Sequence, residues 1–399
     1  MRCPEVADAS GGARGERDGS DGVMGGAVGE STVSLTLVVT RVPAATPPGA
    51  VLFVASNVHG WVAAPGTGRL CRTDDGTWEV RLAVPAGTRV EYKLTRGSWE
   101  TVEKGPRGEE RPNRVVQVGA EDVEVRLGVS AWADRVAPAP VGRTVSGDVT
   151  IVDGFAAPEL GGERRLRVYL PPGYAASRRR YPVLFMHDGQ NLFDASSSFA
   201  GEWEVDESLD ALAREGRFEG LIVVGLDNAG EARLDEYSPW RDRQLGKGGR
   251  GDIYASFLVR TLKPFVDRTW RTLPDREHTG IAGSSMGGLI SLYAGLRYPE
   301  VFSRVAAFSP TLGFAARMPM RYLRTARARL PQRLYLDMGG AESGHPTRDR
   351  ELVELVRAAA STLEVGGFEV RLVIDAPAQH HESAWAVRFP EAVTWLFRP

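Results

Sequence analysis

Apolar residues alternate with polar ones in the first third of the chain. Val33, Leu35, Leu37 and Val39 fall on one face of an extended segment, as expected for a strand with one buried face. The same alternation, or a short apolar run, recurs over residues 51–54, 78–84, 90–94, 115–118 and 123–127. Turn-forming residues separate these segments, and no helical period is visible. The pattern predicts a small all-β sandwich of the immunoglobulin-like type over residues 31–128.

From about residue 145 the pattern changes to short apolar strands that alternate with amphipathic helices. The predicted strands are residues 166–170, 183–186, 221–224, 278–282, 305–308, 334–336 and 370–374. The predicted helices are residues 205–212, 254–266, 289–296 and 352–363. Strands that alternate with helices form a mostly parallel sheet with helices on both faces. Residues 145–399 are therefore predicted to form a doubly wound α/β domain.

Two segments outside these domains differ in composition. Residues 1–30 are rich in glycine, serine and charged residues and carry almost no large apolar side chain, which predicts a disordered tail. Residues 129–144 are rich in alanine, valine and proline, which predicts a linker between the two domains.

Residues 283–287 read Gly-Ser-Ser-Met-Gly, a G-x-S-x-G pattern between a predicted strand and a predicted helix. Such a turn lifts a serine hydroxyl clear of the sheet, so we expect Ser285 to be a nucleophile. The next backbone N–H, that of Met286, would open the helix and could donate to an oxyanion. Because glycine and serine are frequent in this chain, the pattern by itself is equally consistent with a glycine-rich turn.

A serine nucleophile needs a base, and the base needs an acid that orients it. On α/β-hydrolase sheets these residues follow in the order serine, acid, histidine. His380 and His381 lie in the loop after the last predicted strand, where such a base belongs. The loop after the preceding strand offers two acids, and we prefer Glu342 over Asp337 because Glu342 lies farther into a glycine-rich loop.

The second oxyanion donor is expected in the loop after the predicted strand 183–186, at Gly189 or Gln190. His187 and Asp188 in this loop have no further residues at metal-ligand spacing, so we expect them to hold the loop through hydrogen bonds. The predicted chemistry needs no metal and no organic cofactor.

Composition excludes several other functions. The formal net charge of −2 predicts no general attraction to nucleic acid or to an anionic membrane. No stretch of 18 apolar residues is present, and the first residues lack the apolar core of a signal peptide. We therefore expect a cytoplasmic protein, although a different start site would allow a secretion signal. The oligomeric state does not follow from the sequence.

Several segments after residue 145 resemble the putative esterase family of α/β hydrolases, which includes enterochelin, feruloyl and acetyl-xylan esterases. The matching segments are residues 184–194, 227–230, 233–237, 282–288, 308–310 and 381–385. The resemblance implies Ser285 as nucleophile, Glu342 as acid and His381 as base. Many relatives carry aspartate at the acid position, which keeps Asp337 as the alternative.

The same resemblance implies a wall of the substrate pocket formed by Asn228, Arg233, Glu236 and Tyr237. An ion pair between an arginine and a glutamate that braces this segment would explain the same residues equally well.

The first domain resembles starch-binding-type carbohydrate modules in residues 59–61, 75–78, 91–93, 98–100 and 112–114. In such modules the counterparts of Trp61, Lys93 and Trp99 hold sugar rings by stacking and hydrogen bonding. An insertion at residues 101–111 departs from that pattern, and related esterases use such domains as structural lids. We therefore expect either a glucan-binding domain or a lid.

These observations together predict a serine carboxyl-ester hydrolase that acts through an acyl-enzyme. An acylated saccharide, a siderophore and a small acyl ester all fit as substrates. Two alternatives remain: an acyltransferase that uses the same triad on a sugar or another alcohol, and a glucan-binding protein whose hydrolase domain is inactive.

Overall fold

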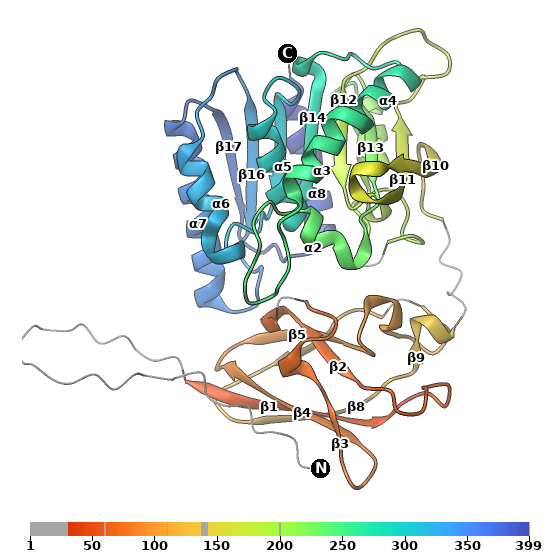
Figure 1. The fold of residues 1–399 in the computed structure, drawn as a ribbon, viewed down its shortest axis with the longest axis vertical. Helices are drawn as coiled ribbons and strands as arrows, with labels where there is room; N and C mark the ends of the chain where they lie inside the picture. Colours follow the sequence, from red (N-terminus) through yellow and green to blue (C-terminus); the bar gives the residue numbers. More distant parts are fainter. Residues whose placement is uncertain (1–30, 60, 110, 137–142, 199–200, 399) are drawn as a thin grey trace, which may run out of the picture. The chain divides into compact units, whose positions relative to one another are not determined.

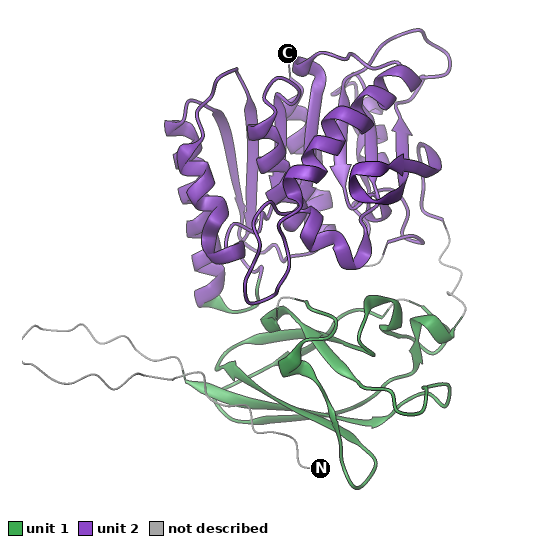
Figure 2. Ribbon diagram, in the orientation of Figure 1, with its two compact units in different colours: residues 1–141, 343–346 green, residues 142–342, 347–399 purple. Residues whose placement is uncertain are grey.

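The structure is a computed structural model that describes residues 31–59, 61–109, 111–136, 143–198 and 201–398. The chain divides into two compact units (Figure 2). Unit 1 comprises residues 1–141 and 343–346, and unit 2 comprises residues 142–342 and 347–399. The predicted tail at residues 1–30 lies outside the described residues.

Unit 1 is built from short strands. A four-stranded sheet has the order β3-β4-β1-β8, a three-stranded sheet has the order β2-β5-β7, and β6 pairs with β9. The bounds are β1 Thr32–Arg41, β2 Phe53–Ser56, β3 Cys71–Arg72, β4 Trp78–Pro85, β5 Arg89–Thr95, β6 Glu103–Lys104, β7 Arg114–Gln117, β8 Val123–Gly128 and β9 Ala131–Trp132. Each strand predicted from the alternating pattern is present.

One core joins the two larger sheets of unit 1. Leu35 and Leu37 of β1 pack in the same cluster as Tyr92 and Leu94 of β5, and all four are at most 2% exposed. Trp132 belongs to this core and is fully buried. Unit 1 therefore extends past the predicted boundary at residue 128, because the large indole side chain of the predicted linker segment is buried in its core.

Unit 2 contains an eight-stranded sheet in the order β10-β11-β13-β12-β14-β15-β16-β17 (Figure 1). The pairs β10–β11 and β11–β13 are antiparallel, and all later pairs are parallel. The bounds are β10 Asp148–Ala157, β11 Gly162–Leu170, β12 Val183–His187, β13 Ile222–Leu226, β14 Thr279–Ser284, β15 Arg304–Phe308, β16 Arg333–Gly339 and β17 Glu369–Asp375.

The helices of unit 2 lie on both faces of this sheet (Figure 1). Their bounds are α1 Val205–Arg214, α2 Arg233–Glu236, α3 Gly251–Phe257, α4 Lys263–Thr269, α5 Met286–Arg297, α6 Phe314–Thr325, α7 Pro346–Val365 and α8 Glu382–Leu396. A π-helical turn, Leu258–Leu262, joins α3 to α4. No described helix has the length and apolarity that would let it cross a membrane.

Each strand of the parallel sheet supplies side chains to two cores. In β12, Val183 and Phe185 pack with helices α3 to α7, whereas Leu184 and Met186 pack with α1 and α8. A strand that is buried on both faces is continuously apolar, which is why these strands were visible in the sequence. The doubly wound α/β-hydrolase prediction is confirmed.

The sequence pattern missed several short elements (β3, β6, β9 and α2) and three longer ones. β10 pairs with β11 at one edge of the sheet and is largely exposed, so it carries no buried run. α8 contains an internal proline, Pro390, a residue that normally ends a helical pattern. α6 is interrupted at residues 315–317, which have positive φ, so its regular helical part is short and begins near Pro319.

Candidate active site

The G-x-S-x-G segment forms a sharp turn between β14 and α5. Ser285 has φ 55° and ψ −119°, a conformation that non-glycine residues seldom adopt. Its N–H donates to the carbonyl of Phe308 at 2.9 Å, and its carbonyl accepts from Thr311 N–H at 3.1 Å. These bonds hold the strained residue in place.

The glycines beside Ser285 are needed for close packing. A Cβ on Gly283 would lie 2.8 Å from the carbonyl carbon of Gly287 and 2.9 Å from the His187 ring. Real Cβ atoms do not approach backbone this closely. Glycine therefore lets strand, helix and the neighbouring loop converge at the serine.

The Ser285 hydroxyl lies 3.2 Å from the Thr311 hydroxyl, within hydrogen-bond distance. Met286 is the first residue of α5. A first-turn N–H has no acceptor within its own helix and carries the positive end of the helix dipole. Met286 lies at the start of α5, and its role as an oxyanion donor stays a prediction.

Glu342 contacts His380, whereas the family resemblance implied His381 as the partner of the acid. The Glu342 carboxylate bonds His380 Nδ1, and the two side chains are 2% and 32% exposed. His381 instead is the N-cap of α8, where its Nδ1 accepts from the N–H of Ser383 at 3.2 Å. The structure therefore pairs Glu342 with His380 and not with the expected His381, because adjacent residues in this loop point in different directions.

The other oxygen of Glu342 is also held. Glu342 Oε1 accepts from the Ser309 hydroxyl and from the N–H of Gly339, both at 2.6 Å. Ser309 in turn accepts from Trp385 Nε1 at 3.0 Å. Burial raises the pKa of Glu342. The charge and hydrogen bond of His380, together with the bonds from Ser309 and Gly339, outweigh burial, so that the net pKa lies below its usual range.

The same contact acts on His380 in the opposite direction. Burial lowers the pKa of the His380 imidazole, whereas the Glu342 carboxylate raises it by a larger amount. The net pKa of His380 therefore lies above its ordinary value. A carboxylate that binds Nδ1 holds the proton there and leaves Nε2 as the nitrogen that can accept a proton.

Asp337, the alternative acid, has another partner. Its carboxylate forms an ion pair with Arg388 at 2.7 Å, and the two side chains are 0% and 4% exposed. It also accepts from the N–H of Ser309 at 2.8 Å. Asp337 therefore neutralises a buried guanidinium of α8, whereas Glu342 contacts the imidazole.

Neighbouring strands bring these groups together. Ser285, Ser309, Glu342 and His380 follow the carboxyl ends of β14, β15, β16 and β17, which are adjacent and parallel. Ligands of open α/β sheets bind outside this edge.

The predicted oxyanion loop follows β12 and is tightly packed. Asp188 has φ 56°, and residues 189–191 form a short 3₁₀ turn. A Cβ on Gly189 would lie 2.8 Å from the backbone of β13. Gln190 Oε1 accepts from the N–H of Asn228 at 3.2 Å. Only glycine fits at residue 189, which agrees with the predicted turn.

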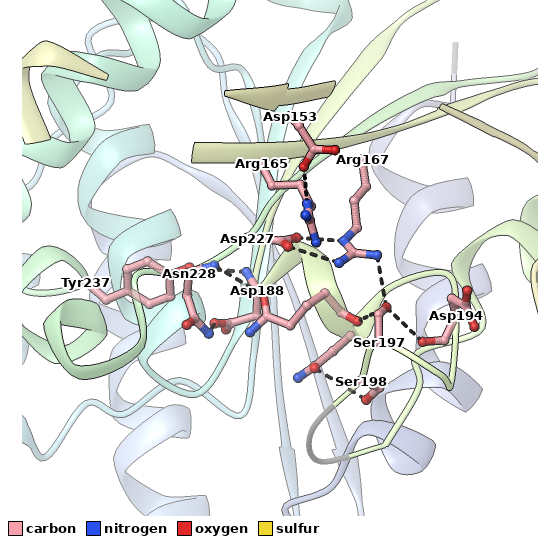
Figure 3. A network of polar contacts seen from close by, with 12 residues as sticks. Asp153, Arg165, Arg167, Asp188, Asp194, Ser197, Ser198, Asp227, Asn228 and Tyr237 are labelled. Atoms are coloured by element: carbon pink, nitrogen blue, oxygen red, sulfur yellow. Dashed lines mark hydrogen bonds and ion pairs between the residues drawn. The ribbon is translucent and has the colours of Figure 1, made fainter. Parts of the chain in front are cut away.

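Ionic and polar contacts support this loop from two sides, as Figure 3 shows in part. On one side Arg167 binds Asp227 at 2.7 and 3.0 Å and the Ser197 hydroxyl at 2.9 Å. Ser197 donates to the Gln190 carbonyl at 2.8 Å. Sequence reasoning did not identify Arg167 and Ser197, because they come from an antiparallel strand and a loop that only the fold brings beside residue 190.

On the other side, Arg233 binds both oxygens of Asp188 at 2.7 and 2.8 Å, and Asn228 donates to the same carboxylate at 2.6 Å. The Tyr237 hydroxyl accepts from the N–H of Asp188 at 3.2 Å. Glu236 forms its ion pair with Arg164 at 2.5 Å. The expected pocket wall is corrected here, because Glu236 and Tyr237 are 1% and 0% exposed and lie behind the loop.

His187 contributes to packing rather than to a metal site. It is 3% exposed and its Nδ1 lies 2.9 Å from the Tyr254 hydroxyl. Burial lowers the pKa of His187 to about 4, so the ring is neutral near pH 7.

A shallow cavity of about 410 Å³ adjoins the loop before α8. Its lining residues are Pro377, Ala378, Gln379, His381, Ser383 and Ala384. His381 therefore lines a space next to the candidate base, although it does not contact Glu342 in the way that His380 does.

In unit 1 the predicted sugar-binding residues have different environments. Trp61 and Trp99 are half-buried, and their ring centroids lie 6.5 Å apart at an interplanar angle of 41°. Neither ring belongs to the core cluster of unit 1. Lys93 is only 7% exposed, so it presents little surface to a ligand.

Known proteins are similar to this chain over one or both of its units. The protein YbbA of Bacillus subtilis strain 168, itself uncharacterised, is 27% identical over 257 residues, which cover 61% of this chain and 96% of that protein. An alpha-amylase of Niallia circulans is 35% identical over 119 residues, which are 29% of this chain and 9% of that enzyme.

A crystal structure of the enterobactin esterase from Shigella flexneri shares the fold, with a TM-score of 0.54 at 14% identity and 88% of each chain covered. The family model described as "Putative esterase" matches residues 157–396, which is more than half of the chain. The chain therefore belongs to the putative esterase family of α/β hydrolases and is a carboxylic ester hydrolase.

Proposed function

We propose that this protein hydrolyses carboxyl esters through an acyl-enzyme on Ser285, with His380 as general base and Glu342 as the acid that orients it. The observation that carries the proposal is the bond between Glu342 and His380 Nδ1. It leaves Nε2 of the imidazole as the proton acceptor, and the strained turn at Ser285 presents the nucleophile at the same edge of the sheet.

In the proposed reaction His380 Nε2 takes the hydroxyl proton as Ser285 Oγ attacks the ester carbonyl carbon. The tetrahedral intermediate collapses, and the imidazolium gives its proton to the leaving alcohol. Water, deprotonated by His380, then attacks the acyl-enzyme. The carboxylic acid product is released and Ser285 regains its proton. Glu342 stabilises the imidazolium in both halves of the reaction without taking the proton.

The oxyanion of each tetrahedral intermediate needs preorganised donors. We assign the N–H of Met286 as one donor and the N–H of Gly189 or Gln190 as the second. The position of Met286 at the start of α5 supports the first, and the rigid support of the 188–191 turn supports the second.

Matched variants test this assignment. Ser285→Ala and His380→Ala should each abolish turnover of p-nitrophenyl acetate and labelling of the serine by a fluorophosphonate. His381→Ala is the control and should retain most of the activity, since His381 caps α8. Loss of activity in the His381 variant, with His380→Ala still active and both proteins folded, would contradict the proposal.

The same experiments separate the two alternative functions. A folded wild-type protein that a fluorophosphonate does not label would be a binding protein with an inactive second unit. An acyltransferase would label but would form an acylated sugar when glucose, maltose or trehalose is added. We propose hydrolysis, and free acid should then remain the main product in the presence of these sugars.

For the substrate, we propose an acylated saccharide, with unit 1 as its carbohydrate-binding part. Two observations support this. Trp61 and Trp99 form an aromatic pair outside the core of unit 1, and the alignment with an alpha-amylase is about as long as this unit. Aromatic faces stack on the C–H groups of sugars.

Binding to insoluble starch tests the role of unit 1. Wild-type protein should be retained, and Trp61→Ala or Trp99→Ala should reduce retention at least tenfold with unchanged esterase activity on p-nitrophenyl acetate. Val115→Ala, at an exposed position of β7, is the control. If wild-type protein is not retained, unit 1 is not a starch-binding domain. A parallel panel of esters with different acyl groups would then identify the substrate by acyl size.

A further inference from the structure

Three acidic side chains converge at the start of α1, away from the proposed triad residues. One carboxylate oxygen from each of Glu202, Asp206 and Glu207 lies within 4.8 Å of the other two. Asp206 and Glu207 belong to the first turn of α1, and Glu202 lies in the segment just before it.

Two oxygens in this cluster are buried without a partner. Asp206 is 0% exposed, and its Oδ2 accepts from the N–H groups of Ser146 and Gly147 at 2.8 and 3.0 Å. Its Oδ1 has no hydrogen-bond partner within the described part of the chain, and the same is true of Glu207 Oε2. A buried carboxylate oxygen without a partner is unfavourable, so these oxygens need either a shared proton or a positively charged partner.

No basic side chain of the described segments supplies that charge. The ion pairs of these segments leave Glu202, Asp206 and Glu207 unpaired, and the neighbouring Asp194 is paired with Arg143 at 3.5 Å. The remaining contact is neutral, because the Thr144 hydroxyl lies 2.8 and 2.9 Å from the two oxygens of Glu202. The cluster thus combines three carboxylates with one hydroxyl oxygen.

We propose that Glu202, Asp206 and Glu207 bind a calcium ion. Calcium prefers oxygen ligands at about 2.3–2.6 Å, so that ligands on opposite sides of the ion lie about 4.6–5.2 Å apart. The three carboxylate oxygens fall within that span. Magnesium would require a tighter shell at about 2.0–2.1 Å and keeps more of its water. Water would complete the calcium shell.

The ion would order a segment that packs against the loop before α8 and against α8 itself. Gly201 lies against His381, since a Cβ there would be 2.9 Å from the His381 ring. The Trp203 ring packs against that of Trp385 in α8, with centroids 5.6 Å apart and an interplanar angle of 38°. The backbone N–H of Trp203 donates to the Asn191 carbonyl at 2.9 Å. Calcium at residues 202–207 would therefore stabilise both the loop before α8 and the turn after β12.

Terbium luminescence and thermal unfolding test this site in the full-length protein. Terbium replaces calcium at oxygen sites, and Trp203 would sensitise its emission. Wild-type protein after chelation should show tryptophan-sensitised terbium emission that calcium displaces, and calcium should raise its Tm by several degrees. Asp206→Asn and Glu207→Gln should each weaken terbium binding at least tenfold and remove the Tm shift.

Glu204→Gln is the matched control, because it removes the same charge from an exposed position within the same segment. It should keep the calcium response. If wild-type protein shows neither emission nor a Tm shift at pH 7 and pH 9, the proposal is overturned, and Asp206 and Glu207 share a proton instead. If all three variants lose the response equally, a diffuse negative surface binds the ions, and the proposal is overturned as well. Should Asp206→Asn fail to fold, Glu202→Gln, at a half-buried position, takes its place.

Discussion

Replacing Glu342 by glutamine changes one group of the proposed triad with almost no change in shape. The side-chain oxygen of glutamine can keep the bonds from Ser309 and Gly339 that Glu342 Oε1 accepts. The amide N–H₂ then faces His380 Nδ1. Because an amide donates where the carboxylate accepted, Nδ1 must lose its proton and Nε2 must carry it. The nitrogen that should accept the serine proton is then already protonated.

The size of the effect follows from the geometry. An imidazolium and a carboxylate about 4 Å apart attract by about 4 kcal/mol at an effective dielectric constant of about 20. The His380 side chain is 32% exposed, and solvent screening reduces this to about 3 kcal/mol. That loss alone lowers kcat roughly 100-fold. The wrong tautomer adds to it, and an equivalent amide substitution in a serine protease costs about 10⁴. We therefore expect kcat to fall between about 10² and 10⁴.

The assay is the pH profile of kcat and kcat/KM on p-nitrophenyl acetate for wild type and Glu342→Gln. Activity requires a neutral base, so it rises with pH through the pKa of His380. Glu342 raises that pKa in the wild type, and the residual activity of the variant should therefore begin to rise at a lower pH. A variant that keeps more than a tenth of the wild-type kcat, or an unshifted profile, would refute the role of Glu342.

Three further predictions concern the framework of the site. Asp337→Asn removes the nearer of the two carboxylates that pair with the buried Arg388 guanidinium and leaves Asp375 at 3.4 Å. The free energy of unfolding, measured in urea, should therefore fall by up to about 3 kcal/mol. Glu391→Gln in an exposed ion pair should cost less than about 1 kcal/mol, and equal losses would contradict the burial argument. Gly283→Ala should abolish activity or folding, because the added Cβ would lie 2.8 Å from the backbone of Gly287. Gly313→Ala is the control and should change neither activity nor Tm, because no atom lies within 4 Å of its added Cβ. Burial raises the pKa of Glu382 to about 7, so the folded state keeps a proton that the unfolded state releases near pH 4 to 5. Stability should fall from pH 5 to 7.5 by about 2.4 kcal/mol more in the wild type than in Glu382→Gln, and parallel urea curves would exclude this titration.

Local pattern was sufficient for most of the fold. Strands buried on both faces are continuously apolar, and the sandwich strands alternate, so both sets were visible in the sequence. The edge strand β10, the interrupted helix α6 and the proline-containing helix α8 were not visible, because exposure, a break in the helix and an internal proline each remove the usual signal. The acidic cluster at residues 202–207 is readable as acidic sequence, but only the fold shows that Asp206 is fully buried.

The sequence by itself was enough to predict Ser285 as the nucleophile and to prefer Glu342 as the acid. The G-x-S-x-G turn has a glycine two residues before and two residues after Ser285. Glu342 lies in a glycine-rich loop at the end of a recognisable strand. Both signals are local, since they depend on what the backbone can do at a single turn.

Tertiary structure decided which of the two adjacent histidines faces that acid, and why the other acid is not free. His380 and His381 differ by one position, and their directions depend on how the loop enters α8. Asp337 forms an ion pair with Arg388, which lies 51 positions later in the sequence. The contacts that set the roles of these side chains span 38 and 51 positions in the sequence, and packing alone brings such groups together.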